Sequence, residues 1–208
     1  YKEKVEALQK DKDDKVVFLY TNNPEEQFGF VKNANDRGYD VLHLDGPLAS
    51  HWIAKMEQTF EGVSFARVDA DTLDKLIQKD EEIPSKLTEE DEGKLRPMFE
   101  EVISKDKFTV QFESMSASDA PIIITQPEFI RRMMEQQRMG GGFAGAFPEM
   151  HNLVINSNHE KISEILSTKT KKSQERKIKQ LTDIAMLSQG MLKGEKLNEF
   201  IERSIDLV

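Results

Sequence analysis

The sequence predicts a small three-layer α/β/α unit in residues 1–87, followed by an α+β unit in residues 88–208 that ends in helices. Three observations lead to this fold class. In the first half, apolar runs rich in β-branched and aromatic residues alternate with helical patterns. In the second half, three strand patterns are followed by helical patterns only. The excess acidity of the chain lies almost entirely before residue 107, and the acidic stretch 80–92 marks the boundary.

The first half reads as strand, helix, strand, helix, strand. The expected strands are residues 16–20, 41–44 and 63–68. The first helix is expected to begin at Asn23 as its cap, with Pro24 in the first turn, and to end at Gly38. The second helix has a stripe of apolar residues at Leu48, Trp52, Met56 and Phe60. Short connections between such elements predict a parallel sheet covered by helices.

The second half begins with a helical pattern at residues 89–104, in which Pro97 predicts an irregularity. The expected strands are residues 108–112, 121–124 and 153–155. A helix at about 127–138 and a glycine-rich loop lie between the last two strands. Beyond His159 the pattern is helical to the end of the chain, which gives the α+β unit a helical tail.

Composition excludes several classes of protein. The chain has 208 residues, a formal net charge of −9 and no cysteine, so a disulfide framework, a thiolate nucleophile and a cysteine-ligated zinc site are all excluded. No apolar run is long enough to span a bilayer, and the first residues do not resemble a signal peptide. We therefore expect a cytoplasmic protein without a membrane partner. Because the chain opens on Tyr1 inside a helical pattern, we expect a piece of a longer polypeptide.

The motifs of catalysis are weak. Gly140, Gly142 and Gly145 form a Gly-x-Gly-x-x-Gly sequence, but a helix precedes it and a strand follows, which is the wrong order for dinucleotide binding, so we interpret it as a hinge loop. The four histidines lack metal-ligand spacing, and no serine nucleophile motif is present. We predict no enzyme activity, no metal and no cofactor in this chain. A small-molecule enzyme that uses the carboxyl ends of the first three strands remains the alternative.

A basic run lies in the helical tail, from Lys169 to Lys179. Aromatic residues do not interleave with it and the surrounding unit is not basic, so a solvated helix is favoured over a nucleic-acid partner.

Apolar residues supply the stronger functional signal. A helical stripe leads into a glycine-rich loop with two phenylalanines. The residues concerned are Phe129, Ile130, Met133, Met134, Phe143 and Phe147. Methionine side chains suit surfaces that accept many partners, so we interpret the group as a binding surface for other protein chains, with Trp52 as a further contact. The alternative is that the stripe and Trp52 pack into the core of a purely structural module.

The last helices keep an apolar stripe to the end of the chain. Two antiparallel helices bury such a stripe well by pairing with two more, and a second copy across a twofold axis is the simplest source. We therefore predict a homodimer. The interface residues expected are Ile178, Leu181, Ala185, Leu192, Leu197, Phe200, Ile201 and Ile205.

The order of these parts resembles the bacterial members of the ninety-kilodalton heat-shock chaperone family. The resemblance rests on Arg37-Gly38-Tyr39-Asp40-Val41-Leu42, on Asp45-Gly46-Pro47-Leu48 with Trp52, and on Asp183-Ile184-Ala185-Met186-Leu187 with Asn198-Glu199-Phe200-Ile201-Glu202-Arg203. It covers essentially the whole chain. It implies the end of the middle domain followed by the C-terminal dimerization domain.

The resemblance also implies a function. Members of the family are ATP-driven dimeric chaperones of the stress response, and their ATP and magnesium site would lie in domains before Tyr1. Unfolded or partly folded client proteins are then the expected partners, contacted by Trp52 and by the helix that carries Phe129 to Met134.

Overall fold

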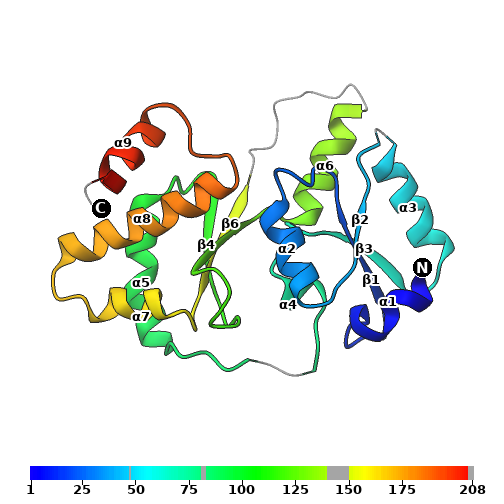
Figure 1. Cartoon of the computed structure of the whole chain (residues 1–208), viewed down its shortest axis with the longest axis horizontal. Helices are drawn as coiled ribbons and strands as arrows, with labels where there is room; N and C mark the ends of the chain where they lie inside the picture. The colour runs from blue at the N-terminus through cyan, green and yellow to red at the C-terminus, as the bar shows by residue number, and fades with distance from the viewer. Residues whose placement is uncertain (47, 81–82, 140–149, 206–208) are drawn as a thin grey trace. The chain divides into compact units, whose positions relative to one another are not determined.

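The computed structural model describes residues 1–46, 48–80, 83–139 and 150–205, with side chains described to residue 134 in the third of these segments. The chain forms two compact units (Figure 1). The first consists of Tyr1–Glu82 and Thr125–Glu149, and the second of Ile83–Ile124 and Met150–Val208. The compact units are thus not two consecutive segments, because residues 125–149 return to the first unit. The division at 87/88 as a domain boundary of the whole protein stays a prediction.

The first unit contains a three-stranded sheet of β1 (Val16–Thr21), β2 (Val41–His43) and β3 (Val63–Arg67) in the order β2-β1-β3. Both pairings are parallel, with Leu19 opposite Val41 and Phe18 opposite Phe65. The helices are α1 (Lys2–Gln9), α2 (Phe28–Asp36), α3 (Ala49–Thr59) and the single turn α4 (Leu73–Leu76). The parallel strand-helix-strand order that the sequence predicts is confirmed.

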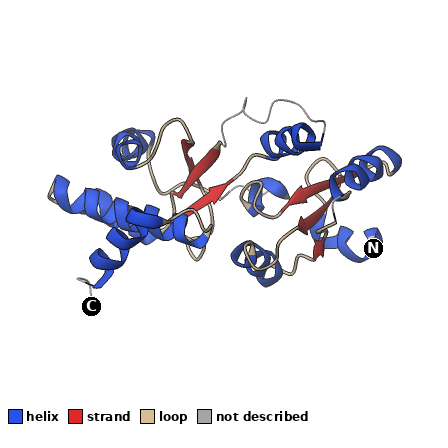
Figure 2. Cartoon of the chain, turned by 90° about the horizontal axis from the view of Figure 1, so that it is seen from above, coloured by secondary structure: helices blue, strands red, loops and turns tan. Residues whose placement is uncertain are grey.

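Alternate residues of β1 are buried on opposite faces of this sheet. Val17 and Leu19 pack in one cluster with Ala34 of α2 and Leu73 of α4. Phe18 and Tyr20 pack in another cluster with Ile53 of α3. Helices therefore cover both faces (Figure 2), which explains why β1 is a continuous apolar run.

The first connection differs from the sequence prediction, because α2 begins at Phe28 rather than after Asn23. The side chain of Gln27 is the physical reason. Its Oε1 accepts a hydrogen bond from the Thr21 hydroxyl at 2.6 Å and another from the Asn22 backbone N–H at 3.2 Å. These bonds tie the start of the helix to the end of β1 and leave residues 24–27 as a turn.

The expected stripe on α3 also differs. Ile53 is the buried residue of the helix, while Leu48 and Phe60 are exposed. Met56 is partly buried against the cluster around Tyr20. Only part of the predicted stripe therefore faces the sheet.

The second unit holds a sheet of β4 (Phe108–Glu113), β5 (Ile122–Thr125) and β6 (His151–Asn156) in the order β4-β6-β5. The central strand is β6, and its pairing with β4 is parallel, with Val110 opposite Leu153. The long connection between these two strands permits this parallel pairing. The helices are α5 (Glu89–Val102), α7 (Glu160–Ser167), α8 (Lys171–Ser188) and α9 (Gly194–Ile205).

The core of the second unit lies between its sheet and its helices. Leu95 and Phe99 of α5 are fully buried in it, together with Ile165 of α7 and Ile178 of α8. Pro97 is accommodated inside α5 without ending the helix. Among the described residues, no helix combines the length and apolarity that crossing a bilayer requires.

Candidate functional site

Helix α6 (Glu128–Met139) follows β5 in the chain but lies against the first unit (Figure 1). Its lead-in is fixed to the end of β3. The Gln126 backbone N–H donates to the Asp69 carbonyl at 3.0 Å, and the Arg67 guanidinium donates to Gln126 Oε1 at 3.2 Å. Residues of the second half of the sequence thus complete the first unit, which periodicity alone does not indicate.

Arg131 is the most buried of the charged side chains that the structure describes on α6, those of residues 128–134. Its guanidinium donates to the Tyr20 hydroxyl on β1 at 2.5 Å and is paired with Glu128 one turn earlier. The same group lies 5.8 Å from the centroid of the Tyr20 ring. Arg131 therefore joins α6 to the central strand of the sheet through both hydrogen bonding and ring contact.

Arg132 makes the second connection, to α3 and β3. It donates to both carboxylate oxygens of Glu57, at 2.9 and 3.2 Å, and to the Phe65 carbonyl at 3.1 Å. A further bond of 2.7 Å joins it to Glu128. The planar fork of arginine suits this simultaneous engagement of a carboxylate and a carbonyl.

These contacts shift the pKa values of Glu128, Arg132 and Tyr20. Burial by itself raises the pKa of the Glu128 carboxyl, but the hydrogen bonds and charges of Arg131 and Arg132 outweigh burial, and the net pKa is lowered. The pKa of Arg132 is raised, chiefly by its hydrogen bond to Glu57. Burial, with the nearby Glu128 charge, raises the pKa of Tyr20. At neutral pH the network therefore consists of charged arginines and carboxylates around a neutral tyrosine.

The apolar stripe of α6 does not form part of any core cluster. Phe129 is 73% exposed, and Ile130, Met133 and Met134 are half-buried. None of the four belongs to, or packs against, the three clusters of buried apolar residues found in the described part of the chain. Among the described residues, the interpretation of this stripe as part of a core is therefore disfavoured.

Trp52 lies on α3 and remains 46% exposed, although the edge of its ring meets Phe65 at a centroid distance of 5.6 Å. It lines an apolar cavity of about 370 Å³ between the sheet and its neighbouring helices. Met56, Phe60 and Phe18 line the same cavity. Trp52 thus both packs on the sheet and presents apolar surface, and it belongs to the same compact unit as α6.

Several predicted residues fall in the segment that the structure does not describe. Phe143, Phe147 and the Gly-x-Gly-x-x-Gly sequence lie in residues 140–149, outside the described residues.

The carboxyl edge of the first sheet is filled by its own side chains. Asp69 accepts hydrogen bonds from Arg67 at 2.5 and 2.9 Å and from Gln27 at 2.8 Å, while Gln27 in turn accepts from Thr21. Open α/β sheets usually bind small ligands at this edge. Here the polar groups satisfy one another, and residues 126–131 lie against them, which disfavours the enzyme alternative. The described residues contain no group of three acidic or histidine side chains that could hold a metal ion.

The predicted interface residues fall into two sets, one buried within the second unit and one partly or fully exposed. Ile178, Ala185 and Leu192 are buried within the second unit, and Leu181 packs against the same core. These side chains stabilise the unit itself, because α8 packs against α5 and α7 on that side. Leu197 and Phe200 are half-buried.

The outward side of α8 and α9 carries exposed apolar residues. Ile201 and Ile205 of α9 are among those predicted, and Ile205 is 68% exposed. Ile184 and Leu187 of α8 are also exposed, although the sequence prediction did not place them in the interface. Their spacing of three residues puts them on one side of α8, and this was the signal that could have identified them.

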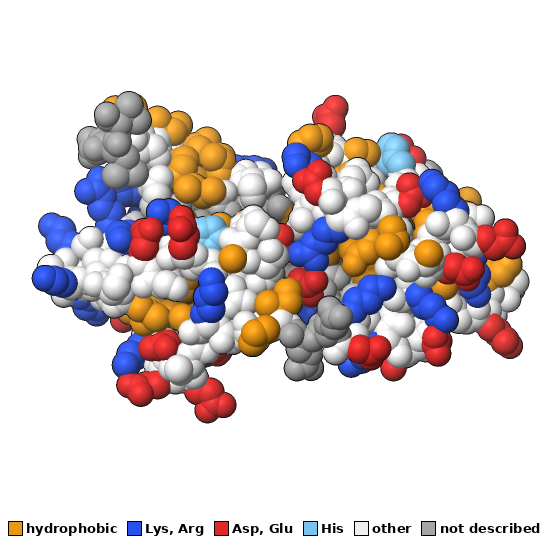
Figure 3. All heavy atoms as spheres, turned by 60° about the horizontal axis from the view of Figure 1, so that its bottom comes forward, with side chains coloured by type: hydrophobic (Ala, Val, Ile, Leu, Met, Phe, Trp, Pro, Cys, Tyr) orange, Lys and Arg blue, Asp and Glu red, His pale blue; other side chains and the backbone are white. Residues whose placement is uncertain are grey.

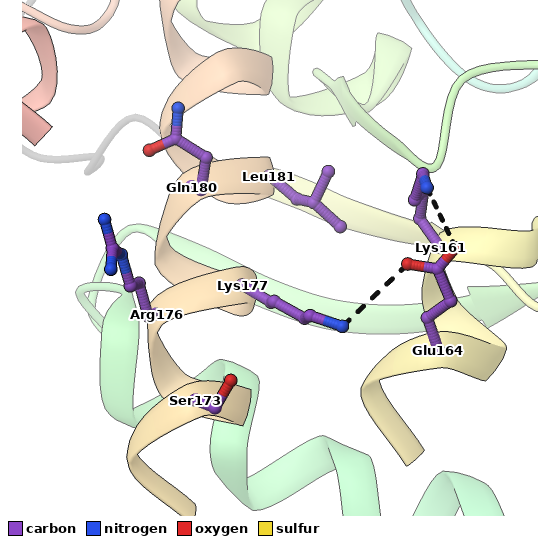
Figure 4. A pocket seen from close by; sticks show the side chains of 7 residues that line it. All are labelled: Lys161, Glu164, Ser173, Arg176, Lys177, Gln180 and Leu181. Carbon is purple, nitrogen blue, oxygen red and sulfur yellow. Dashed lines mark hydrogen bonds and ion pairs between the residues drawn. The ribbon is translucent and has the colours of Figure 1, made fainter. Parts of the chain in front are cut away.

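Three members of the basic run, Lys171, Lys177 and Lys179, are paired with carboxylates. Figure 4 shows Glu164 of α7 between Lys161 and Lys177, at 2.8 and 3.9 Å, in a cavity of about 350 Å³. Lys179 pairs with Asp183 and Glu199. On the face drawn in Figure 3, acidic and basic side chains are interspersed. This arrangement favours the interpretation as a solvated helix over a nucleic-acid surface.

Comparison with known proteins identifies close relatives. The model of the family described as Hsp90 protein matches residues 2–206. The chain is 42% identical to the chaperone protein HtpG of Porphyromonas gingivalis over 172 residues, which cover 80% of this chain and 25% of that protein. It is 31% identical to the chaperone protein HtpG of Bacteroides thetaiotaomicron, in an alignment that covers all of this chain and 41% of that protein. The chain thus spans less than half the length of these relatives.

Proposed function

Because the chain belongs to the Hsp90 protein family of chaperones, we propose that it supplies the client-binding and dimer-forming part of an ATP-dependent molecular chaperone. The observation that carries the client-binding role is the apolar stripe of α6, which is ordered on the first unit but left out of every core cluster of the described residues. An exposed apolar group held on a folded unit is typical of a protein-interaction surface.

The proposed client surface consists of Phe129, Ile130, Met133 and Met134 on α6 together with Trp52 on α3. Methionine and phenylalanine side chains adapt to clients of different shape, whereas the tryptophan ring offers a large and rigid contact. The Arg132 to Glu57 pair joins α6 to the helix that carries Trp52. This link supports a single surface on one unit, although the sequence places the two groups in different domains.

The proposed homodimer uses the exposed apolar residues of α8 and α9. In a dimer, two client surfaces would belong to one particle, so weak contacts with a single client could reinforce one another through effective concentration. We propose further that the ATP and magnesium site lies in parts of the relatives that this chain does not span, and that the chain works in the cytoplasm.

Client binding can be tested with the double substitution Phe129→Ser and Met133→Ser. We expect it to weaken binding of a permanently unfolded probe, reduced and carboxymethylated α-lactalbumin, by about tenfold or more. Removing two exposed apolar side chains from a contact costs on the order of 1.5–3 kcal/mol for each side chain that the client buries fully. Fluorescence anisotropy of the labelled probe measures the dissociation constant. Trp52→Ala should weaken binding to a smaller extent.

Phe28→Ser is the matched control, because Phe28 is an exposed apolar residue of the same unit outside the proposed surface. The control should bind the probe as the unchanged chain does. The proposal fails if the double variant binds normally, or if it unfolds, since unfolding would place Phe129 and Met133 in the core.

A further inference from the structure

The attachment of α6 differs in kind from that of α5, α7 and α8. In the second unit, α5, α7 and α8 are anchored by fully buried apolar residues such as Phe99, Ile165 and Ile178. The described apolar side chains of α6 join none of the core clusters. The hydrogen bonds that join the described side chains of α6 to the sheet and to α3 are made by Arg131 and Arg132, with a further bond of 3.4 Å from the Tyr20 hydroxyl to Glu128.

The geometry points to a polar latch: we propose that Arg131 and Arg132 are positioning residues that hold α6 on the first unit and can release it. The Arg132 to Glu57 pair is partly open to solvent, with 32% and 24% of the two side chains exposed. Release of α6 would display the apolar stripe to a client, and only this consequence rests on the proposed function.

Release of such a helix has a low cost compared with release of a helix packed in a core. When an apolar anchor leaves its site, the hydrophobic stabilisation of the whole buried area is lost. When a partly exposed ion pair separates, water solvates both charges, and the net loss is smaller. The position of α6 is therefore set by charge and by ionic strength, and a modest competing interaction with a client is able to shift it.

The latch joins elements that are distant in the sequence. Arg131 reaches Tyr20 on β1, and Arg132 reaches Glu57 on α3 and the Phe65 carbonyl on β3. Release of α6 would break all of these contacts at once and would leave the sheet and α3 with their own apolar clusters intact. The two states of α6 therefore differ in the latch and not in the fold of the unit.

Hydrogen exchange of the 208-residue chain without any client tests the latch. The variants are Glu57→Gln, Arg132→Gln and the two combined. Glu57→Gln keeps the oxygen that accepts from the Phe65 N–H at 2.9 Å, so β3 and α3 remain joined while the charge is removed. We expect amides of residues 128–134 to exchange about tenfold faster in either single variant, since each removes a hydrogen bond between charged partners. The double variant should exchange little faster than Arg132→Gln alone, because that substitution already removes the pair with Glu57.

Two further measurements separate a latch from a general loss of stability. Arg132→Lys keeps the charge without the planar fork and should restore part of the protection. Raising the salt concentration from about 0.05 M to about 1 M should speed exchange of α6 in the unchanged chain and have less effect in the double variant. Lys32→Gln, which removes an exposed ion pair with Asp36 elsewhere in the same unit, serves as the control and should leave α6 unchanged.

The inference is overturned if the two single variants exchange in α6 at the rate of the control. It is equally overturned if they accelerate exchange in β1 and β3 as much as in α6, because that result would show loss of the whole unit. Neither readout involves a client, so the latch can fail while Phe129→Ser with Met133→Ser still abolishes client binding, and the reverse also holds.

Discussion

Arg131 and Arg132 show how two adjacent residues on one helix can carry different contacts. Glu128 lies three residues before one and four before the other, so it pairs with both along the same side of α6. The guanidinium groups then extend to Tyr20 and Glu57, on elements more than 70 residues away. The spacing of Glu128 with the arginines is visible in the sequence, but the distant partners are not, because nothing local specifies them.

The lowered pKa of Glu128 predicts that acid loosens α6. A carboxyl whose pKa is lowered on folding stabilises the folded state above its ordinary pKa of 4.5, and that contribution is lost as the pH falls below this value. The charged groups that lower the pKa of Glu128 are Arg131 and Arg132 on α6. Tyr20, which is neutral, and Arg67 lie nearby on the sheet. Glu57 shares Arg132.

The measurement is the protection of α6 amides, corrected for the intrinsic pH dependence of exchange, in the unchanged chain and in Glu128→Gln. At pH 7 the unchanged chain should be the better protected of the two. The difference should begin to shrink as the pH falls below 4.5, the ordinary pKa of the group, and should disappear only after the pH has fallen through the lowered pKa of Glu128 in the folded chain. A difference that persisted undiminished well into acid would contradict the assignment of this effect to Glu128.

At the scale of elements, the sequence predicted most strands and helices but not where each belongs. An apolar run identified β1 because burial on both faces leaves a continuous pattern. The start of α2 was missed because Gln27, which a propensity argument treats as ordinary, binds the end of β1 through its side chain. The helix at 127–138 was predicted closely, yet its membership of the first unit depends on contacts that only the folded chain brings together.

Helix α5 allows its cap and its core contact to be compared directly. Thr88 and Asp91 form a reciprocal capping box, in which the Thr88 hydroxyl accepts from the Asp91 N–H and Asp91 accepts from the Thr88 N–H. Thr88→Ala should lower the free energy of unfolding by about 1 kcal/mol. Phe99→Ala, which empties a fully buried site, should lower it by about 3–5 kcal/mol.

Urea denaturation followed by far-ultraviolet circular dichroism measures both effects. Lys94→Ala provides the control on the same helix, since it removes only an exposed ion pair with Glu90 and should have little effect. An effect of Thr88→Ala as large as that of Phe99→Ala would mean that the cap supports more of the unit than α5 alone.

On the scale of the whole molecule, each unit presents its own apolar surface. In the first unit the surface comprises the α6 stripe and Trp52, both singled out in the sequence because their spacing or residue type was unusual. In the second unit the sequence predicted the helical tail that forms α8 and α9, but periodicity did not distinguish the side of α8 that faces its own core from the side that faces outward. Ile178 and Ile184 look alike in a sequence, and only the positions of α5 and α7 decide which is buried.

The exposed side of α8 and α9 predicts how the proposed homodimer responds to substitution. In a twofold interface each residue is used twice, so one substitution removes two contacts. Ile201→Ser or Ile184→Ser should cost about 2 kcal/mol of dimer stability, or roughly a 30-fold weaker dissociation constant, if about half of each side chain becomes buried on association. Sedimentation equilibrium over a range of concentrations measures this constant, with Phe28→Ser as an exposed apolar control in the other unit. A monomer for the unchanged chain at micromolar concentration, or equal weakening by the control, would show that this face does not form the dimer.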